Sequence, residues 1–236
     1  MHDKINQFIS HFNEEIHKVK ELNNKLYQKI IYVTILDALG RARYPKKSPS
    51  DRMKTFVRNY GNWADKDKIS LVQLELNLDF MLTDEEKESS RLLLTTREKI
   101  ATWESGHVYD SSADPVFDEG SKMLTFPDKR VDIENAEESA VTKARYSELF
   151  YAYRNRLIHE YRKPGYAIED NEDTSAFYHS YINGPWELGF PVGLFEKLCC
   201  SCLENLKQYL YHENINPYSR YEFGSMWSER KHFAKP

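Results

Sequence analysis

An arginine, an asparagine and a histidine lie close together in the segment "YAYRNRLIHEYRKPG", residues 151–165. If the segment is a helix, a rotation of about 100° per residue places Arg154, Asn155 and His159 within an arc of roughly 140°. An arginine offers a fixed fork of donors to a phosphate, and an asparagine adds neutral donors and acceptors. A histidine gains or loses a proton near neutral pH. Together these groups suit cleavage of a phosphodiester without a metal.

In RNA, such a reaction begins when a base removes the proton of the 2′-OH and that oxygen attacks the adjacent phosphorus. A cation stabilises the developing charge, and an acid protonates the leaving 5′ oxygen. The products are a 2′,3′-cyclic phosphate and a 5′-OH end. One histidine hardly serves as base and acid at once. A homodimer with two such helices side by side would supply a second histidine and a second arginine.

The neighbouring side chains fit both a binding site and an ordinary packed helix. Tyr153 is a candidate for stacking on a base, although such tyrosines are more often core or dimer contacts. Arg156 and Arg162 are candidates for gripping flanking phosphates. Cations near the end of a helix also complement its dipole, so both interpretations stay open. The apolar Ile158 falls within the polar arc, which indicates that this face also touches another surface.

The composition bounds the kind of protein that carries this segment. The chain has 236 residues, of which 40% are hydrophobic and 14% aromatic, so it is long and apolar enough to bury a core. Nine glycines and nine prolines are few for this length and favour a helical chain. The net charge of -4 means that the whole molecule does not attract nucleic acid, so any phosphate site is local.

Cysteine usage and the absence of long apolar runs predict a cytoplasmic protein. The three cysteines share one apolar segment, 199–202, where buried reduced thiols are expected rather than disulfides or a metal site. His107 with Asp110 and Asp114 lacks metal-ligand spacing. The first residues lack the apolar core of a signal peptide, and no run approaches a membrane span. We expect no metal, no other cofactor and no membrane partner.

Apolar residues at steps of three and four predict helices over most of the first 103 residues. Gly40 and Pro45 should end the second of them, and Ser48 with Pro49 should begin the third. Segment 69–80 alternates partly like a strand, but we favour a helix. Thr83 and the acidic residues after it predict the start of a long helix. The expected helices cover residues 4–22, 26–39, 49–60, 69–80 and 83–103.

The second half of the chain is predicted to hold an insert, the motif helix, a hairpin and a last helix. Residues 104–135 should form an irregular insert, and 136–163 the longest helix, closed by Pro164 and Gly165. Asn183-Gly184 predicts the turn of a hairpin over 177–190. A helix over 192–211 and an aromatic tail, 212–236, complete the chain. The whole is predicted to be a single domain, 1–236, of the all-α class with one small hairpin.

The stretch "RNRLIH", Arg154 to His159, resembles the Arg-x4-6-His motif of the HEPN superfamily, including the polar residue directly after the arginine. The flanking "ARYSELFYAY" and "EYRKPGYAIE", the hairpin reaching "ELGFPVGLFEKL" and the helix "CLENLKQYLYHENINPY" look similar to stand-alone prokaryotic members. The resemblance covers about residues 136–220. It extends more loosely to "IIYVTILDALGRARYP" in the N-terminal part.

This resemblance implies an all-α HEPN-like bundle, dimerisation through the motif helices and metal-independent endoribonuclease activity. Many relatives act as toxins or in defence against phage, some beside an antitoxin partner. Arg154 and His159 would be the catalytic pair and Asn155 their polar supporter. The acidic net charge leaves RNA binding to nearby cations: Lys143, Arg145, Arg154, Arg156, Arg162 and Lys163. The alternatives are a non-catalytic helical module that binds RNA or protein, and a nuclease held inactive until a trigger or antitoxin releases it.

Overall fold

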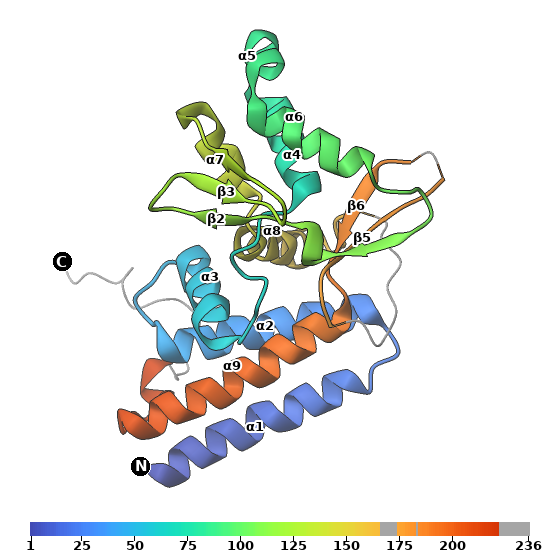
Figure 1. Ribbon diagram of the computed structural model, residues 1–236. Coiled ribbons are helices and arrows are strands. Elements are labelled where there is room, and N and C mark those ends of the chain that lie inside the picture. Colours follow the sequence, from blue (N-terminus) through green and yellow to red (C-terminus); the bar gives the residue numbers. More distant parts are fainter. Residues whose placement is uncertain (166–173, 183, 222–236) are drawn as a thin grey trace, which may run out of the picture.

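The computed structural model describes residues 1–165, 174–182 and 184–221. Its elements gather around two hydrophobic cores, with helix α8 between the two groups (Figure 1). The first core lies among α1 (His2–Lys20), α2 (Lys25–Arg43), α3 (Pro49–Tyr60), α8 (Tyr146–His159) and α9 (Val192–His212). The second core lies among α4 (Leu71–Met81), α6 (Arg91–Ala101), α7 (Asn135–Lys143) and a small sheet.

The prediction of an all-α fold is wrong, because the structure has two three-stranded antiparallel sheets. Residues 104–135 are therefore not irregular: they supply four strands and a short 3-10 helix (Ser111–Ala113). These strands have three residues each, too few to show the alternation that marks a strand in a sequence. One sheet consists of β2 (Val116–Asp118), β3 (Met123–Thr125) and β4 (Arg130–Asp132).

The second sheet contains the hairpin. Strands β5 (Phe177–Ser180) and β6 (Trp186–Gly189) pair antiparallel in the segment where the sequence predicts a hairpin. A third strand, β1 (Val108–Asp110), pairs with β5, so the element is larger than the hairpin alone. Asn183, in the predicted turn, lies outside the described residues.

The predicted helix 136–163 is in fact two helices, α7 and α8. The chain leaves the second core at Ala144 and enters the first at Tyr146. Between them the backbone pairs with residues 68–70: the Tyr146 amide donates to the Lys68 carbonyl at 3.0 Å, and the Ser70 amide donates to the Ala144 carbonyl at 2.9 Å. Hydrogen bonds to a distant segment thus replace helical hydrogen bonds between the two helices. Helix α8 begins at Tyr146 and ends at His159.

Two further helix boundaries differ from the prediction. Gly40 does not end α2, which continues to Arg43; the glycine lies against Arg52 and Phe56 of α3. The predicted helix 83–103 is split into α5 (Asp84–Ser89) and α6. Ser90 caps α6 by accepting from the Leu93 amide at 3.0 Å.

The remaining predicted helices are present in the structure. The Ser48 hydroxyl accepts from the Asp51 amide at the start of α3. The ambiguous segment 69–80 is helical as predicted, but helix α4 begins two residues later, at Leu71, with Ser70 as its cap. Of the predicted tail, the structure describes a 3-10 helix, η2 (Pro217–Arg220), and residues up to 221, and the rest lies outside the described residues. No helix in the described ranges combines the length and the apolar character needed to cross a bilayer.

Candidate functional site

Helix α8 presents one face to the first core, and its other side chains range from buried to exposed. Tyr146, Phe150, Tyr153 and Leu157 are buried at steps of three and four along it. This burial fixes the rotation of the helix. Arg154 and Asn155 are consequently half-buried at the edge of the core, and His159 is exposed at the last turn.

The Arg154 guanidinium is held by two oxygens. Its Nε donates to Asp37 Oδ2 on α2 at 2.9 Å, its Nη2 donates to the same oxygen, and its Nη1 donates to Asn155 Oδ1 at 3.1 Å. Only 15% of the arginine side chain and 19% of the Asp37 side chain are exposed. A guanidinium has five N–H donors, so two remain for another acceptor.

The structure brings Arg154 and Asn155 together but leaves His159 apart. Within the described ranges, no hydrogen bond or ion pair links His159 to either residue. His159 follows Asn155 by four residues and therefore lies one turn further along the same side of α8. One chain thus supplies a fixed cation and a single exposed imidazole.

Asp37 is the site residue that the sequence analysis missed. It orients Arg154, and its second oxygen, Oδ1, is buried without a hydrogen-bond donor among the described residues. The available signal was its isolation: Asp37 is the one acidic residue in α2, Lys25–Arg43, within an otherwise largely apolar stretch.

The three predicted substrate-binding residues differ in accessibility. Tyr153 is 6% exposed, and its ring packs 5.6 Å from the rings of Phe190 and Phe195, so it serves mainly the core. Arg156 and Arg162 are exposed, and both pair with Glu160, at 3.5 and 2.5 Å. These two arginines are therefore the accessible cations at this end of α8.

The turn after α8 explains why Arg162 lies beside Arg156. Tyr161 adopts a left-handed conformation with φ of 54°, and the Arg162 amide donates back to the Arg156 carbonyl at 3.4 Å. A left-handed residue directly after the C-cap residue, here Glu160, is common where a helix ends. The reversal returns the chain over the last turn of α8.

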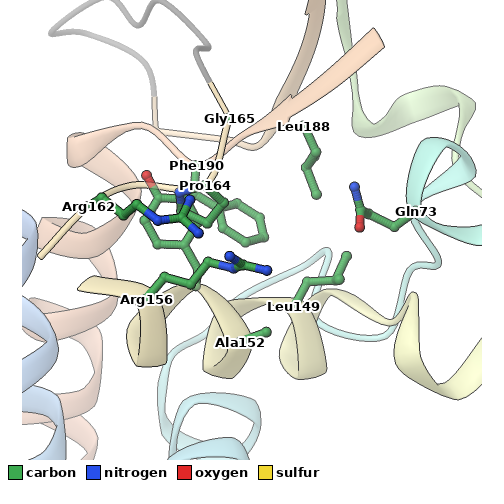
Figure 2. Close-up of a pocket in the computed structure, with 10 residues that line it drawn as sticks. Gln73, Leu149, Ala152, Arg156, Arg162, Pro164, Gly165, Leu188 and Phe190 are labelled. Atoms are coloured by element: carbon green, nitrogen blue, oxygen red, sulfur yellow. The ribbon is translucent and has the colours of Figure 1, made fainter. Parts of the chain in front are cut away.

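A pocket of about 350 Å³ lies on this side of α8 (Figure 2). The Arg156 and Arg162 side chains border it, and Gln73 of α4 faces them across the opening. Its apolar lining includes Leu149 of α8 and Leu188 of β6. The pocket therefore sits where elements of both cores meet.

The other predicted cations differ in exposure. Arg145 is 7% exposed and pairs with Glu119 at 2.8 Å, so little of this arginine is accessible to an RNA strand. Lys143 is exposed and Lys163 is half-buried.

In the ranges that the structure describes, no group of three His, Cys, Asp or Glu residues is placed to hold a metal ion.

Asp114, which the sequence groups with His107 and Asp110, has a structural position instead. It is 3% exposed and accepts hydrogen bonds from the hydroxyls of Tyr146 at 2.5 Å and Tyr178 at 2.7 Å, and from the Leu71 amide at 3.0 Å. Burial raises the pKa of its carboxyl to about 7, although these hydrogen bonds act in the opposite direction. Asp114 thus joins α4, α8 and β5.

Comparison of the chain with protein-family models, with curated proteins and with solved structures gives no match in any of the three. The resemblance to the HEPN superfamily therefore stays a prediction that depends on the motif and its context.

Proposed function

We propose that this protein is a metal-independent endoribonuclease of the HEPN type. The observation that carries the proposal is the Arg154 guanidinium, fixed between Asp37 and Asn155 with two donors left, one turn from the exposed His159. A fixed cation of this kind suits the charge that develops on a phosphate during cleavage. His159 would remove the 2′-OH proton or protonate the leaving 5′ oxygen.

The second imidazole of the reaction would come from a second copy of the chain. Exposed apolar side chains near His159 support a homodimer through this face: Tyr27 and Ile31 on α2 are 46% and 37% exposed, and Tyr161 is 60% exposed. The rings of Tyr27 and Tyr161 lie 6.1 Å apart and form one patch. Pairing two such faces would bury the patches and bring two copies of α8 together.

His159→Ala tests the proposal directly. Incubation of labelled RNA with the purified protein should yield 2′,3′-cyclic phosphate and 5′-OH ends, with no inhibition by EDTA. His159→Ala should lower the cleavage rate at least about a hundredfold, the usual contribution of a general acid or base, while the circular dichroism spectrum stays unchanged. His212→Ala, at the exposed end of α9, is the matched control. Full activity in His159→Ala would contradict the proposal.

The pairing of Arg154 with Asp37 favours one alternative, a non-catalytic module that binds RNA or a protein, because this arginine already has a charged partner. The same experiment separates the two, since a binding module leaves the RNA intact. We further propose that the cleavage acts in the cytoplasm as a toxin or in defence against phage, under the control of an antitoxin or a trigger. Growth arrest on expression of the wild-type chain, absent with His159→Ala, would support that role.

A further inference from the structure

The pocket beside α8 combines a positively charged end with apolar walls. Arg156 and Arg162 carry two positive charges next to the negative charge of Glu160, and the Glu187 carboxylate lies beside Gly165 of the lining. Leu149, Leu188 and Phe190 form apolar walls, and the Gln73 amide faces the arginines across the pocket (Figure 2). At about 350 Å³ the pocket is in the range of natural small-molecule sites, about 300–1,000 Å³.

These groups match the parts of one nucleotide. Arginine binds phosphate oxygens through its planar fork of donors, and the apolar walls can contact the faces of a base. A glutamine amide both donates and accepts hydrogen bonds, as the edge of a base requires. A purely apolar ligand would leave the two guanidiniums unused, and an inorganic anion would leave the apolar walls unused.

The pocket adjoins the candidate catalytic face of the same helix. Ala152 lines the pocket and is exposed, and it precedes Asn155 by three residues and Arg156 by four. It is therefore a neighbour of both on the helix surface. Because its side chain is one methyl group, a strand passing from Asn155 to Arg156 meets no bulky obstacle there.

We propose that this pocket holds one nucleotide of the RNA strand, adjacent to the nucleotide whose phosphate is cleaved. This inference depends on the proposed function for its place in the reaction, but its chemistry is that of a binding site. Arg156 and Arg162 bind the phosphate, the apolar walls bind the base, and Gln73 contacts the edge of the base. Glu160 competes with the phosphate for both arginines.

Because Glu160 competes with the phosphate, variants of the arginines and of Glu160 should change RNA affinity in opposite directions. The probe is a fluorescein-labelled 2′-O-methyl oligoribonucleotide, which binds without being cleaved because the attacking hydroxyl is blocked. By fluorescence anisotropy, Arg156→Gln and Arg162→Gln should each weaken binding about tenfold, since each removes a charge-assisted contact. Each should also reduce the salt slope of log K by about 0.7. Glu160→Gln should instead tighten binding several-fold, because both guanidiniums are released.

Two further variants test whether the effect is local to the pocket and whether the pocket contacts the base. Arg91→Gln on α6, an exposed arginine that is not among the residues lining the pocket, removes the same charge and should leave the dissociation constant within about twofold. Gln73→Ala should change which of four homopolymeric probes binds best while leaving the salt slope unchanged. Equal binding by wild type, Arg156→Gln and Arg162→Gln, or no gain with Glu160→Gln, would overturn the inference.

These experiments distinguish failure of the pocket assignment from failure of the nuclease proposal. If the probe binds as expected but unmodified RNA is not cleaved, the nuclease proposal fails and the nucleotide pocket stands. If RNA is cleaved and the arginine variants keep the wild-type KM, the pocket assignment fails and the nuclease stands. Displacement of the probe by free ribonucleoside monophosphates, with an affinity independent of oligonucleotide length, would assign the pocket to a free nucleotide and overturn its place on the strand.

Discussion

At the scale of single residues, the ion pair of Asp37 and Arg154 is the feature on which the candidate site depends. Both side chains are less than one-fifth exposed, so removing one charge leaves the other poorly solvated. Loss of one partner of a buried pair is costly, whereas exposed pairs contribute little. We therefore predict that Asp37→Asn lowers the free energy of unfolding by about 2 kcal/mol and lowers RNA cleavage, because the Arg154 guanidinium loses its orientation.

Asp79→Asn is the matched control for this prediction. Asp79 pairs with Arg97 at 2.8 Å, but the two side chains are 51% and 44% exposed. Urea unfolding should show a change of at most about 0.5 kcal/mol for this variant. Equal effects of Asp37→Asn and Asp79→Asn would argue against a special role for the pair at α8.

At the scale of elements, the hairpin of β5 and β6 supports one wall of the pocket. Gly189 faces Phe177 across the two strands, and a Cβ at Gly189 would lie 2.5 Å from the Phe177 ring. The ring occupies the space that the missing side chain leaves. We predict that Gly189→Ala destabilises the protein by about 2 kcal/mol, the usual cost of overpacking, and shifts the neighbouring Leu188 and Phe190.

Thermal unfolding of four variants would check this packing: Gly189→Ala, Gly120→Ala, Phe177→Leu and the double variant of Gly189 and Phe177. Gly120→Ala, where the nearest atom to a Cβ is Asp118 Oδ1 at 3.3 Å, should change the melting temperature little, because that carboxylate can move. Combining Gly189→Ala with Phe177→Leu should recover part of the lost stability, since the smaller side chain makes room. Additive losses in the double variant would contradict direct contact as the cause.

At the scale of the whole molecule, Asp114 links the two cores through Leu71, Tyr146 and Tyr178. Burial raises the pKa of its carboxyl from 3.8 to about 7 in the folded state. Between pH 4 and 7 the folded protein keeps a proton that the unfolded chain has lost, so the contribution of this group to stability falls as the pH rises through that window. Above about pH 7 both states are ionised and the contribution is constant.

We predict that Asp114→Asn removes this dependence, because a neutral amide does not titrate. In the wild type, Asp114 should lower the free energy of unfolding by up to about 1.4 kcal/mol for each unit of pH increase between pH 4 and 7. Urea unfolding of both proteins at several values between pH 4 and 8 would measure it. An unchanged difference in stability between the two proteins at pH 4.5 and pH 7.5 would refute the assignment.

The sequence by itself determined the local elements. Apolar residues at steps of three and four predicted α1, α2 and α9, the caps at Ser48 and Thr83 predicted helix starts, and Asn183-Gly184 predicted the hairpin region. Each of these signals acts over a few residues, so it survives without knowledge of the rest of the chain. The same local pattern also identified Arg154, Asn155 and His159 as candidates on one helix.

Only the tertiary structure decided where these elements break and what surrounds the candidates. The three-residue strands and the division of α7 from α8 depend on backbone bonds to distant segments, such as Tyr146 to Lys68. Asp37 reaches Arg154 across 117 residues of sequence. The pocket likewise forms where α4, α8 and β6 meet. Such contacts arise from packing between elements, and local residue patterns do not encode which distant groups will meet.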